Sequence, residues 1–288
     1  MPKIGIVLSG CAGKGAYEIG CMLAIREYFG AENIKCISSA SMGAVIGQPF
    51  ALGRVEQMER AFREMDSGRF GRHIMAFSTN PEVLGVISEM IGDGEEPLCE
   101  HYVCSWNFTG KTAEYIPFHT LRGEKLLQYM QSAISIPIFS KGVKIDGQRR
   151  LDGAFLDNIP VYPLTNKDLD VIFCIYFDNA EYLFESVEFD RKIIKLNDFP
   201  NNDRLEVLVY EAGSYDRMRD YGYQYTRRVL SEVFDGKEEE EYAAAVAAYG
   251  KSRAKQFKKR LTADVVLNGI NTAVRNYSGA LTVREKLK

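Results

Sequence analysis

The sequence lacks both the long apolar runs of membrane spans and the basic excess typical of nucleic-acid-binding proteins. Its longest strongly apolar stretch, residues 171–177, is far shorter than the roughly 18 residues that a spanning helix needs. The formal net charge is −3, from 36 basic and 39 acidic residues, so no nucleic-acid partner is expected. The first residues offer only Lys3 before a short apolar run and a Gly-rich turn, which does not match a signal peptide. We therefore expect a cytoplasmic protein, with export by a route that needs no signal peptide left open.

Histidine is scarce, and the cysteines have no metal-binding spacing. The three histidines are His73, His101 and His119, and none follows His119. A triad of the α/β-hydrolase type places its histidine late in the chain, after the nucleophile and the acid, so this triad is excluded. The six cysteines include no Cys-x-x-Cys pair and no Cys/His cluster with zinc spacing. We expect reduced thiols, no metal and no organic cofactor.

The first 52 residues alternate between strand and helix patterns. At 288 residues the chain has the length of one or two domains. Residues 3–8 and 34–38 are short β-branched runs that predict buried strands, and residues 16–29 have apolar side chains at helical spacing. Residues 42–52 are small and apolar, as in a buried helix. This alternation predicts an α/β fold with a parallel sheet covered by helices.

Two later segments have a different character. Glycines interrupt the apolar pattern of residues 66–100, which predicts either a loosely packed helical connection or a lid over an apolar pocket. After residue 201 the chain becomes helix-rich, and residues 238–261 begin acidic and end basic, a polarity that suits the helix dipole. The basic end indicates either a solvated helix face or peripheral contact with an anionic membrane.

The turn Gly10-Cys11-Ala12-Gly13-Lys14-Gly15 joins the first predicted strand to the first predicted helix. Small residues at such a junction let backbone N–H groups face a ligand, and the helix start adds partial positive charge. The loop suits a phosphate or a developing oxyanion. It is not a Walker A loop, because Lys14 is followed by Gly15 rather than Ser or Thr, and it lacks the dinucleotide-binding spacing.

A second turn, Ser39-Ala40-Ser41-Met42-Gly43, follows the second predicted strand. A serine on a sharp strand-to-helix turn is typical of an exposed nucleophile. In isolation such a serine is more often a helix N-cap, but the Gly-rich turn earlier in the chain favours the nucleophile. A nucleophilic serine needs a base. Lys14 is a poor base unless its pKa is strongly lowered, which leaves a carboxylate. Asp152, after a hairpin predicted around Asp146-Gly147, is the candidate, and a turn aspartate is its alternative interpretation.

Four blocks in order resemble the patatin-like phospholipase family and cover roughly residues 3 to 178. The blocks are 8–17, 39–44, 135–139 and 152–161 (LSGCAGKGAY, SASMGA, SIPIF and DGAFLDNIPV). The resemblance implies a three-layer α/β/α sandwich with a mainly parallel central sheet. It implies a catalytic domain over residues 1–200, with 201–288 as a helical C-terminal region packed on it or extending it.

The same resemblance implies a lipid acyl hydrolase of the phospholipase A or lysophospholipase type with a Ser–Asp dyad. Ser41 would be the nucleophile and Asp152 its base. The remaining implied site residues are the oxyanion-hole positions Gly10, Cys11, Ala12 and Gly13, and the supporting residues Lys14, Gly43 and Gly153.

Three positions depart from the family pattern. Cys11 and Ala12 stand where the family usually has consecutive glycines, and Ser39 stands where glycine is usual in the elbow. If the first two need a positive φ, their Cβ atoms carry strain, so we expect weakened or specialised activity. The alternatives are a non-catalytic or weakly active lipid or acyl-chain binding protein, a phosphate-binding protein, and a reactive Cys11 thiol.

Overall fold

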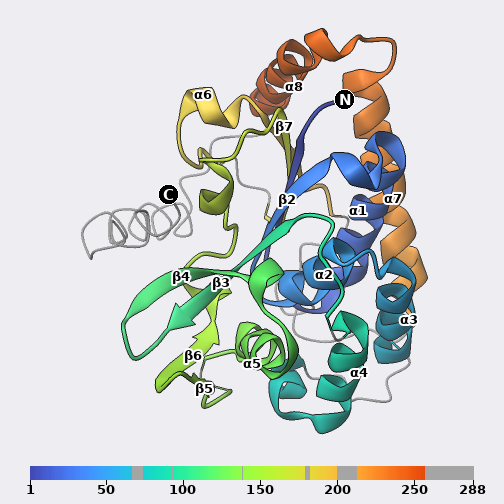
Figure 1. Ribbon diagram of the computed structural model, residues 1–288. Coiled ribbons are helices and arrows are strands. Elements are labelled where there is room, and N and C mark those ends of the chain that lie inside the picture. Colours follow the sequence, from blue (N-terminus) through green and yellow to red (C-terminus); the bar gives the residue numbers. More distant parts are fainter. Residues whose placement is uncertain (67–73, 93, 138, 179–181, 200–212, 257–288) are drawn as a thin grey trace.

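The computed structural model describes residues 1–66, 74–92, 94–137, 139–178, 182–199 and 213–256 (Figure 1). Within these residues, eight strands form one sheet in the order β5-β6-β3-β2-β1-β7-β8, and β4 also pairs with β3. The strands are β1 (Ile4–Leu8), β2 (Ile34–Ser39), β3 (Glu100–Asn107), β4 (Thr112–Pro117), β5 (Val143–Ile145), β6 (Gln148–Asp152), β7 (Val171–Ile175) and β8 (Ile193–Leu196).

The sheet is mainly parallel, as the sequence predicts. Strands β3, β2, β1, β7 and β8 are parallel to one another. Strands β4 and β6 pair with β3 in antiparallel fashion, and β5 pairs with β6 in the same way. All residues of β1 and β7 are buried, because helices and loops cover both faces of a central parallel strand. The predicted hairpin at Asp146-Gly147 joins β5 to β6, and both turn residues have positive φ (50° and 79°).

Helices flank this sheet (Figure 1), which confirms the predicted α/β class. They are α1 (Gly15–Phe29), α2 (Met42–Ala51), α3 (Val55–Asp66), α4 (Pro81–Ile91), α5 (Gly123–Ala133), α6 (Val187–Asp190), α7 (Tyr215–Phe234) and α8 (Tyr242–Gln256). The largest apolar cluster joins α1, α2 and α7 to one face of the sheet. A smaller cluster, which includes Val7, Ile172 and Leu164, covers the opposite face.

The described part of the C-terminal region is helical and packs on the first helix. Helix α7 lies along α1 (Figure 1), and the two backbones approach closely at Gly20 and Gly222. The division into a 1–200 domain and a 201–288 region stays a prediction. No helix within the described ranges is long and apolar enough to cross a membrane.

The predicted lid, residues 66–100, is only partly described, since 67–73 and 93 lie outside the described residues. Its described portion contains α4, which buries Val83, Ile87 and Met90 and packs against α3. Asn80 caps α4 by accepting a hydrogen bond from the Glu82 amide at 2.9 Å. This portion is therefore a packed helix, and movement of the segment stays a prediction.

Candidate active site

The C-terminal ends of β2 and β6 meet along one edge of β3, and the candidate site lies where they meet. Both β2 and β4 pair with Tyr102 and Val103 of β3, so these two strands lie on opposite edges of β3. Both β4 and β6 pair with Ser105 to Asn107, so β6 shares an edge with β2. Strand β2 ends opposite Val103, and antiparallel β6 ends opposite Ser105. The C-terminal ends of β2 and β6 are thus only about 7 Å apart along β3, at roughly 3.3 Å per residue.

Ser41 occupies the sharp turn between β2 and α2. Its backbone has φ 54° and ψ −130°, a strained conformation for a residue with a side chain. Its hydroxyl does not cap α2; instead it donates a hydrogen bond of 2.6 Å to Oδ2 of Asp152. A Cβ at Gly43 would lie 2.9 Å from the Ser9 carbonyl oxygen and from Leu8 Cβ, so the turn admits only glycine there.

Asp152 is 3% exposed, and burial raises the pKa of its carboxyl group to about 7. Its Oδ1 accepts a hydrogen bond of 2.9 Å from the Ala154 amide, as a turn aspartate does, while Oδ2 accepts from Ser41. Asp152 therefore makes the hydrogen bond of a turn aspartate and also contacts Ser41, and its role as a base stays a prediction. A Cβ at Gly153 would lie 2.3 Å from the Cys104 carbonyl oxygen of β3. Only glycine therefore allows the backbone that follows Asp152 to lie so close to β3.

The Gly-rich loop faces this pair through Gly10. A Cβ at Gly10 would lie 3.1 Å from Ser41 Cβ and 2.9 Å from Ala154 Cβ. The Gly10 amide donates to Asn158, with 3.1 Å to Oδ1 and 3.2 Å to the carbonyl oxygen. This amide therefore anchors the loop and, contrary to the sequence-based expectation, is not free to act as an oxyanion donor. Cys11, Ala12 and Gly13 remain as candidates, since none of their amides has a hydrogen bond among the described residues.

The two departures in the loop differ in conformation. Cys11 has φ −121°, which any residue adopts, and its side chain is 1% exposed. Ala12 has φ 45°, the left-handed region that favours glycine. Strain is therefore carried by Ala12 alone. Burial raises the pKa of the Cys11 thiol well above its usual value, which argues against a reactive thiolate.

Two charged residues of the same region are buried. The Lys14 ammonium lies over the rings of Phe199 and Phe177, with 4.4 and 5.4 Å to the centroids. Glu18, in the first turn of α1, is fully buried, and burial raises the pKa of its carboxyl group well above the usual value. Neither of its carboxyl oxygens has a hydrogen-bond partner in the described part of the chain.

Sequence reasoning missed the role of His101. The ring of this fully buried residue bridges Ser39 Oγ and Gln48 Oε1, each at 2.8 Å. Because an amide oxygen only accepts, Nδ1 carries the proton toward Gln48 and Nε2 accepts from Ser39. Burial lowers the pKa of His101 to about 3, so the ring stays neutral. His101 thereby connects the unusual elbow residue Ser39 to α2 through hydrogen bonds. In the sequence, only a histidine within a buried strand indicates this connection.

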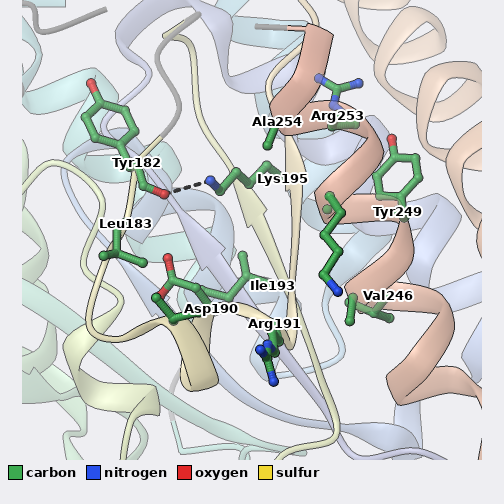
Figure 2. Close-up of a pocket in the computed structure, with 14 residues that line it drawn as sticks. Tyr182, Leu183, Asp190, Arg191, Ile193, Lys195, Val246, Tyr249, Arg253 and Ala254 are labelled. Atoms are coloured by element: carbon green, nitrogen blue, oxygen red, sulfur yellow. Dashed lines mark hydrogen bonds between the residues drawn. The ribbon is translucent and has the colours of Figure 1, made fainter. Parts of the chain in front are cut away.

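A separate cavity of about 270 Å³ lies at the other end of the sheet, and neither Ser41 nor Asp152 lines it. Figure 2 shows it between β8, with Ile193 and Lys195, and α8, with Tyr249 and Arg253. Lys195 Nζ donates to the Tyr182 carbonyl oxygen at 2.7 Å. No group of three or more potential metal-ligating His, Cys, Asp or Glu side chains occurs among the residues that the structure describes.

Comparisons with known proteins indicate the family of the chain. A family model described as patatin-like phospholipase matches residues 6–165. An uncharacterized NTE family protein of Mycobacterium tuberculosis is 22% identical over 189 residues, which make up 62% of this chain and 50% of that protein. The lysophospholipase NTE1 of Eremothecium gossypii is 25% identical over 192 residues, 60% of this chain and 12% of that protein. The chain thus spans half or less of the length of these relatives.

The fold itself is found in a solved structure. VipD from Legionella pneumophila superimposes with a TM-score of 0.52 at 14% sequence identity, covering 88% of this chain and 75% of that one. At this identity the likeness concerns the fold alone.

Proposed function

The chain belongs to the patatin-like phospholipase family, and we propose that it hydrolyses acyl esters of lipids, as a phospholipase A or lysophospholipase does, through a Ser41–Asp152 dyad. The observation that carries the proposal is the 2.6 Å hydrogen bond from Ser41 Oγ to Asp152 Oδ2. It joins a hydroxyl on a strained elbow to a buried carboxyl, beside a loop of backbone amides at a helix start. This is the arrangement that a nucleophile, its base and an oxyanion hole require.

In the first half of the reaction, Asp152 accepts the proton of Ser41 while the serine oxygen bonds to the acyl carbonyl carbon. The carbonyl oxygen gains the negative charge, and the amides of Cys11, Ala12 and Gly13 donate hydrogen bonds to it. When the tetrahedral intermediate collapses, the ester C–O bond breaks and the alcohol leaves with the proton from Asp152. The acyl group stays on Ser41.

In the second half, Asp152 takes a proton from water, whose oxygen attacks the acyl carbon. Collapse releases the fatty acid and returns the proton to Ser41. A pKa near 7 suits a group that must alternately accept and release a proton at neutral pH. All of these steps use residues of the chain itself.

The comparisons support the substrate class. The family is named for phospholipases, and a fungal relative is named as a lysophospholipase. Both names describe hydrolysis of an acyl ester in a lipid. The proposal is therefore a lipid ester hydrolase of this type.

Turnover of a soluble ester, p-nitrophenyl butyrate, tests the dyad. We expect Ser41→Ala and Asp152→Asn each to reduce kcat/KM by about 10³-fold or more. Ser88→Ala, an exposed serine of α4, controls for the loss of a hydroxyl and should leave the rate unchanged. Equal rates in wild type and both dyad variants would rule out the dyad.

A fluorophosphonate probe separates the enzyme from a non-catalytic lipid-binding protein. The probe bonds covalently to an activated serine, so we expect labelling of wild type at Ser41 and no labelling of Ser41→Ala. Absence of labelling together with intact fatty-acid binding would favour the binding protein instead.

A further inference from the structure

Three aromatic side chains form an exposed cluster at the end of the sheet that carries Asp152. The rings of Trp106 and Phe155 stack in parallel, with 5.5 Å between centroids and 2° between planes. Phe108 meets Trp106 edge to face at 5.3 Å. Yet Phe108 is 46% exposed and Phe155 is 61% exposed. Such contiguous apolar surface on a water-facing part of a protein is typical of an interaction site.

Strand register places two cations on the same face. Trp106 pairs with Leu151, and the Phe108 amide donates to the Arg149 carbonyl oxygen at 2.9 Å. Arg149 in turn pairs with Lys144. Cross-strand partners point to the same side of a sheet, so Lys144 and Arg149, both exposed, lie beside the aromatic rings.

The opposite face of this hairpin is already occupied. Arg150 projects there, pairs with Glu114 at 2.6 Å and lies 5.1 Å from the Tyr129 ring of α5. The acidic residue of the hairpin turn, Asp146, is held by Lys125 at 2.8 Å. The net charge presented with the aromatic rings is therefore positive.

The cluster is continuous with the candidate active site. Phe155 is the last residue of the short turn Gly153–Phe155 that follows Asp152. Within that turn, Ala154 lies against Gly10 of the Gly-rich loop. Any surface that covers the aromatic rings is thus brought next to the dyad.

We propose that the docking face, formed by Trp106, Phe108, Phe155, Lys144 and Arg149, seats the protein on a lipid bilayer with anionic head groups. Aromatic rings bury well at the boundary between head groups and acyl chains, and Lys and Arg are attracted to anionic lipids. The inference rests on the proposed function, because docking here delivers a lipid ester to Ser41. This docking face is a different membrane contact from the basic end of residues 238–261 that the sequence suggested.

The chain's single tryptophan, Trp106, lies in the docking face and serves as the probe. The Ser41→Ala variant would be titrated with vesicles of phosphatidylcholine alone and with vesicles that also contain about 30% phosphatidylserine, which sets a strong anionic surface potential. We expect a blue shift of Trp106 emission and quenching by lipids brominated on the acyl chain. Binding without either change, or no binding to either vesicle, would overturn the proposal.

Variants then separate the contributions. Phe108→Ser with Phe155→Ser should weaken vesicle partitioning by about 100-fold, roughly tenfold for each buried ring. Lys144→Glu with Arg149→Glu should remove most of the preference for phosphatidylserine. Leu183→Ser with Val187→Ser is the matched control, because these side chains are also 65% and 63% exposed but lie at the other end of the sheet. Equal weakening by the control would contradict the assignment.

Turnover of p-nitrophenyl butyrate without vesicles distinguishes the two proposals. For this test, Phe108→Ser and Lys144→Glu are made in the protein that retains Ser41. Both variants should hydrolyse the soluble ester at the wild-type rate and lose activity on vesicle lipid. If wild type hydrolyses neither the soluble ester nor vesicle lipid while the vesicle-binding results hold, the proposed function is wrong and the docking face stands. Loss of soluble-ester turnover in Phe108→Ser would contradict the docking role, because Phe108 would then be needed for hydrolysis without any membrane.

Discussion

Burial sets the protonation state of Asp152 and hence the pH range of the proposed reaction. The base must be ionised to accept the serine proton, and the pKa of this carboxyl group is raised to about 7. We therefore expect kcat/KM for p-nitrophenyl butyrate to rise with pH through an inflection near 7 and to fall about tenfold per pH unit on the acid side. A rate that is flat from pH 5 to 8 would contradict this assignment.

The Gly-rich loop provides a matched pair of substitutions to glycine. Ala12 has φ 45° and Cys11 has φ −121°, so only Ala12 carries left-handed strain. We expect Ala12→Gly to raise the free energy of unfolding by roughly 0.5–1 kcal/mol. Cys11→Gly should lower it by roughly 1–2 kcal/mol through loss of a buried side chain. Urea unfolding measures both, and the same sign for both variants would show that backbone strain does not decide the outcome.

At the scale of elements, the α1–α7 contact depends on two glycines. A Cβ at Gly20 would lie 1.9 Å from the Arg219 carbonyl oxygen, and one at Gly222 would lie 2.3 Å from the Tyr17 carbonyl oxygen. Backbone cannot move aside as a side-chain end can, so the helices must separate. We expect Gly222→Ala to lower the free energy of unfolding by about 3 kcal/mol or more.

The control for this prediction is Gly250→Ala in α8, where no other described part of the chain beyond the helix's own backbone lies within 4 Å of the added Cβ. Here alanine should raise the free energy of unfolding by roughly 0.5–1 kcal/mol, because glycine is a poor helix former. Chemical denaturation compares the two variants directly. Similar effects at both positions would mean that helix propensity, rather than close packing, governs this part of the molecule.

The elements near the N-terminus could be predicted from sequence because their signals are local. The run at 34–38 corresponds to β2, Ile34–Ser39, and the stretch 42–52 corresponds to α2, Met42–Ala51. Apolar spacing of 2 or 3.6 residues encodes such elements within a few turns of chain. The family motifs add the pairing of Ser41 with Asp152, which spacing alone does not give.

The contacts that shape the site could not be predicted because they join distant parts of the chain. Asn158 binds the Gly10 amide across 148 positions, and His101 binds Ser39 across 62. The meeting of β2 with β6 along β3 depends on strand register, which no local pattern encodes. Sequence therefore predicted that Ser41 and Asp152 act together, and the structure shows them hydrogen-bonded. The contacts that support them, and the hydrogen bonds that occupy the Gly10 amide, required coordinates.

At the scale of the whole molecule, buried carboxyl groups link stability to pH in a direction opposite to that of surface ion pairs. The pKa values of Glu18 and Asp152 are both raised in the folded state by burial. The ordinary pKa values of aspartate and glutamate are about 4. Between about pH 4 and neutrality, the unfolded chain therefore releases these two protons and the folded chain keeps them. The stability that these two groups contribute is thus present at acid pH and is lost as pH rises.

Glu18 provides the sharper test, since it is fully buried and outside the proposed dyad. Each such group reduces the free energy of unfolding by about 1.4 kcal/mol per pH unit while the folded state alone holds the proton. Glu18→Gln removes this term, so we expect the variant to gain stability over wild type progressively as the pH rises above the usual pKa of a glutamate. Urea unfolding at several pH values measures the difference.

Glu56→Gln, at an exposed position of α3, controls for loss of a carboxyl group and should change the free energy of unfolding by no more than about 0.5 kcal/mol at any pH. A difference between Glu18→Gln and wild type that stays constant with pH would show that Glu18 does not hold a proton in the folded state. Because Glu18 belongs to the helix that the Gly-rich loop begins, a proton held there keeps net negative charge away from the amides of Cys11, Ala12 and Gly13. The pH dependence of stability therefore tests whether Glu18, on the helix that follows these candidate oxyanion donors, is neutral in the folded protein.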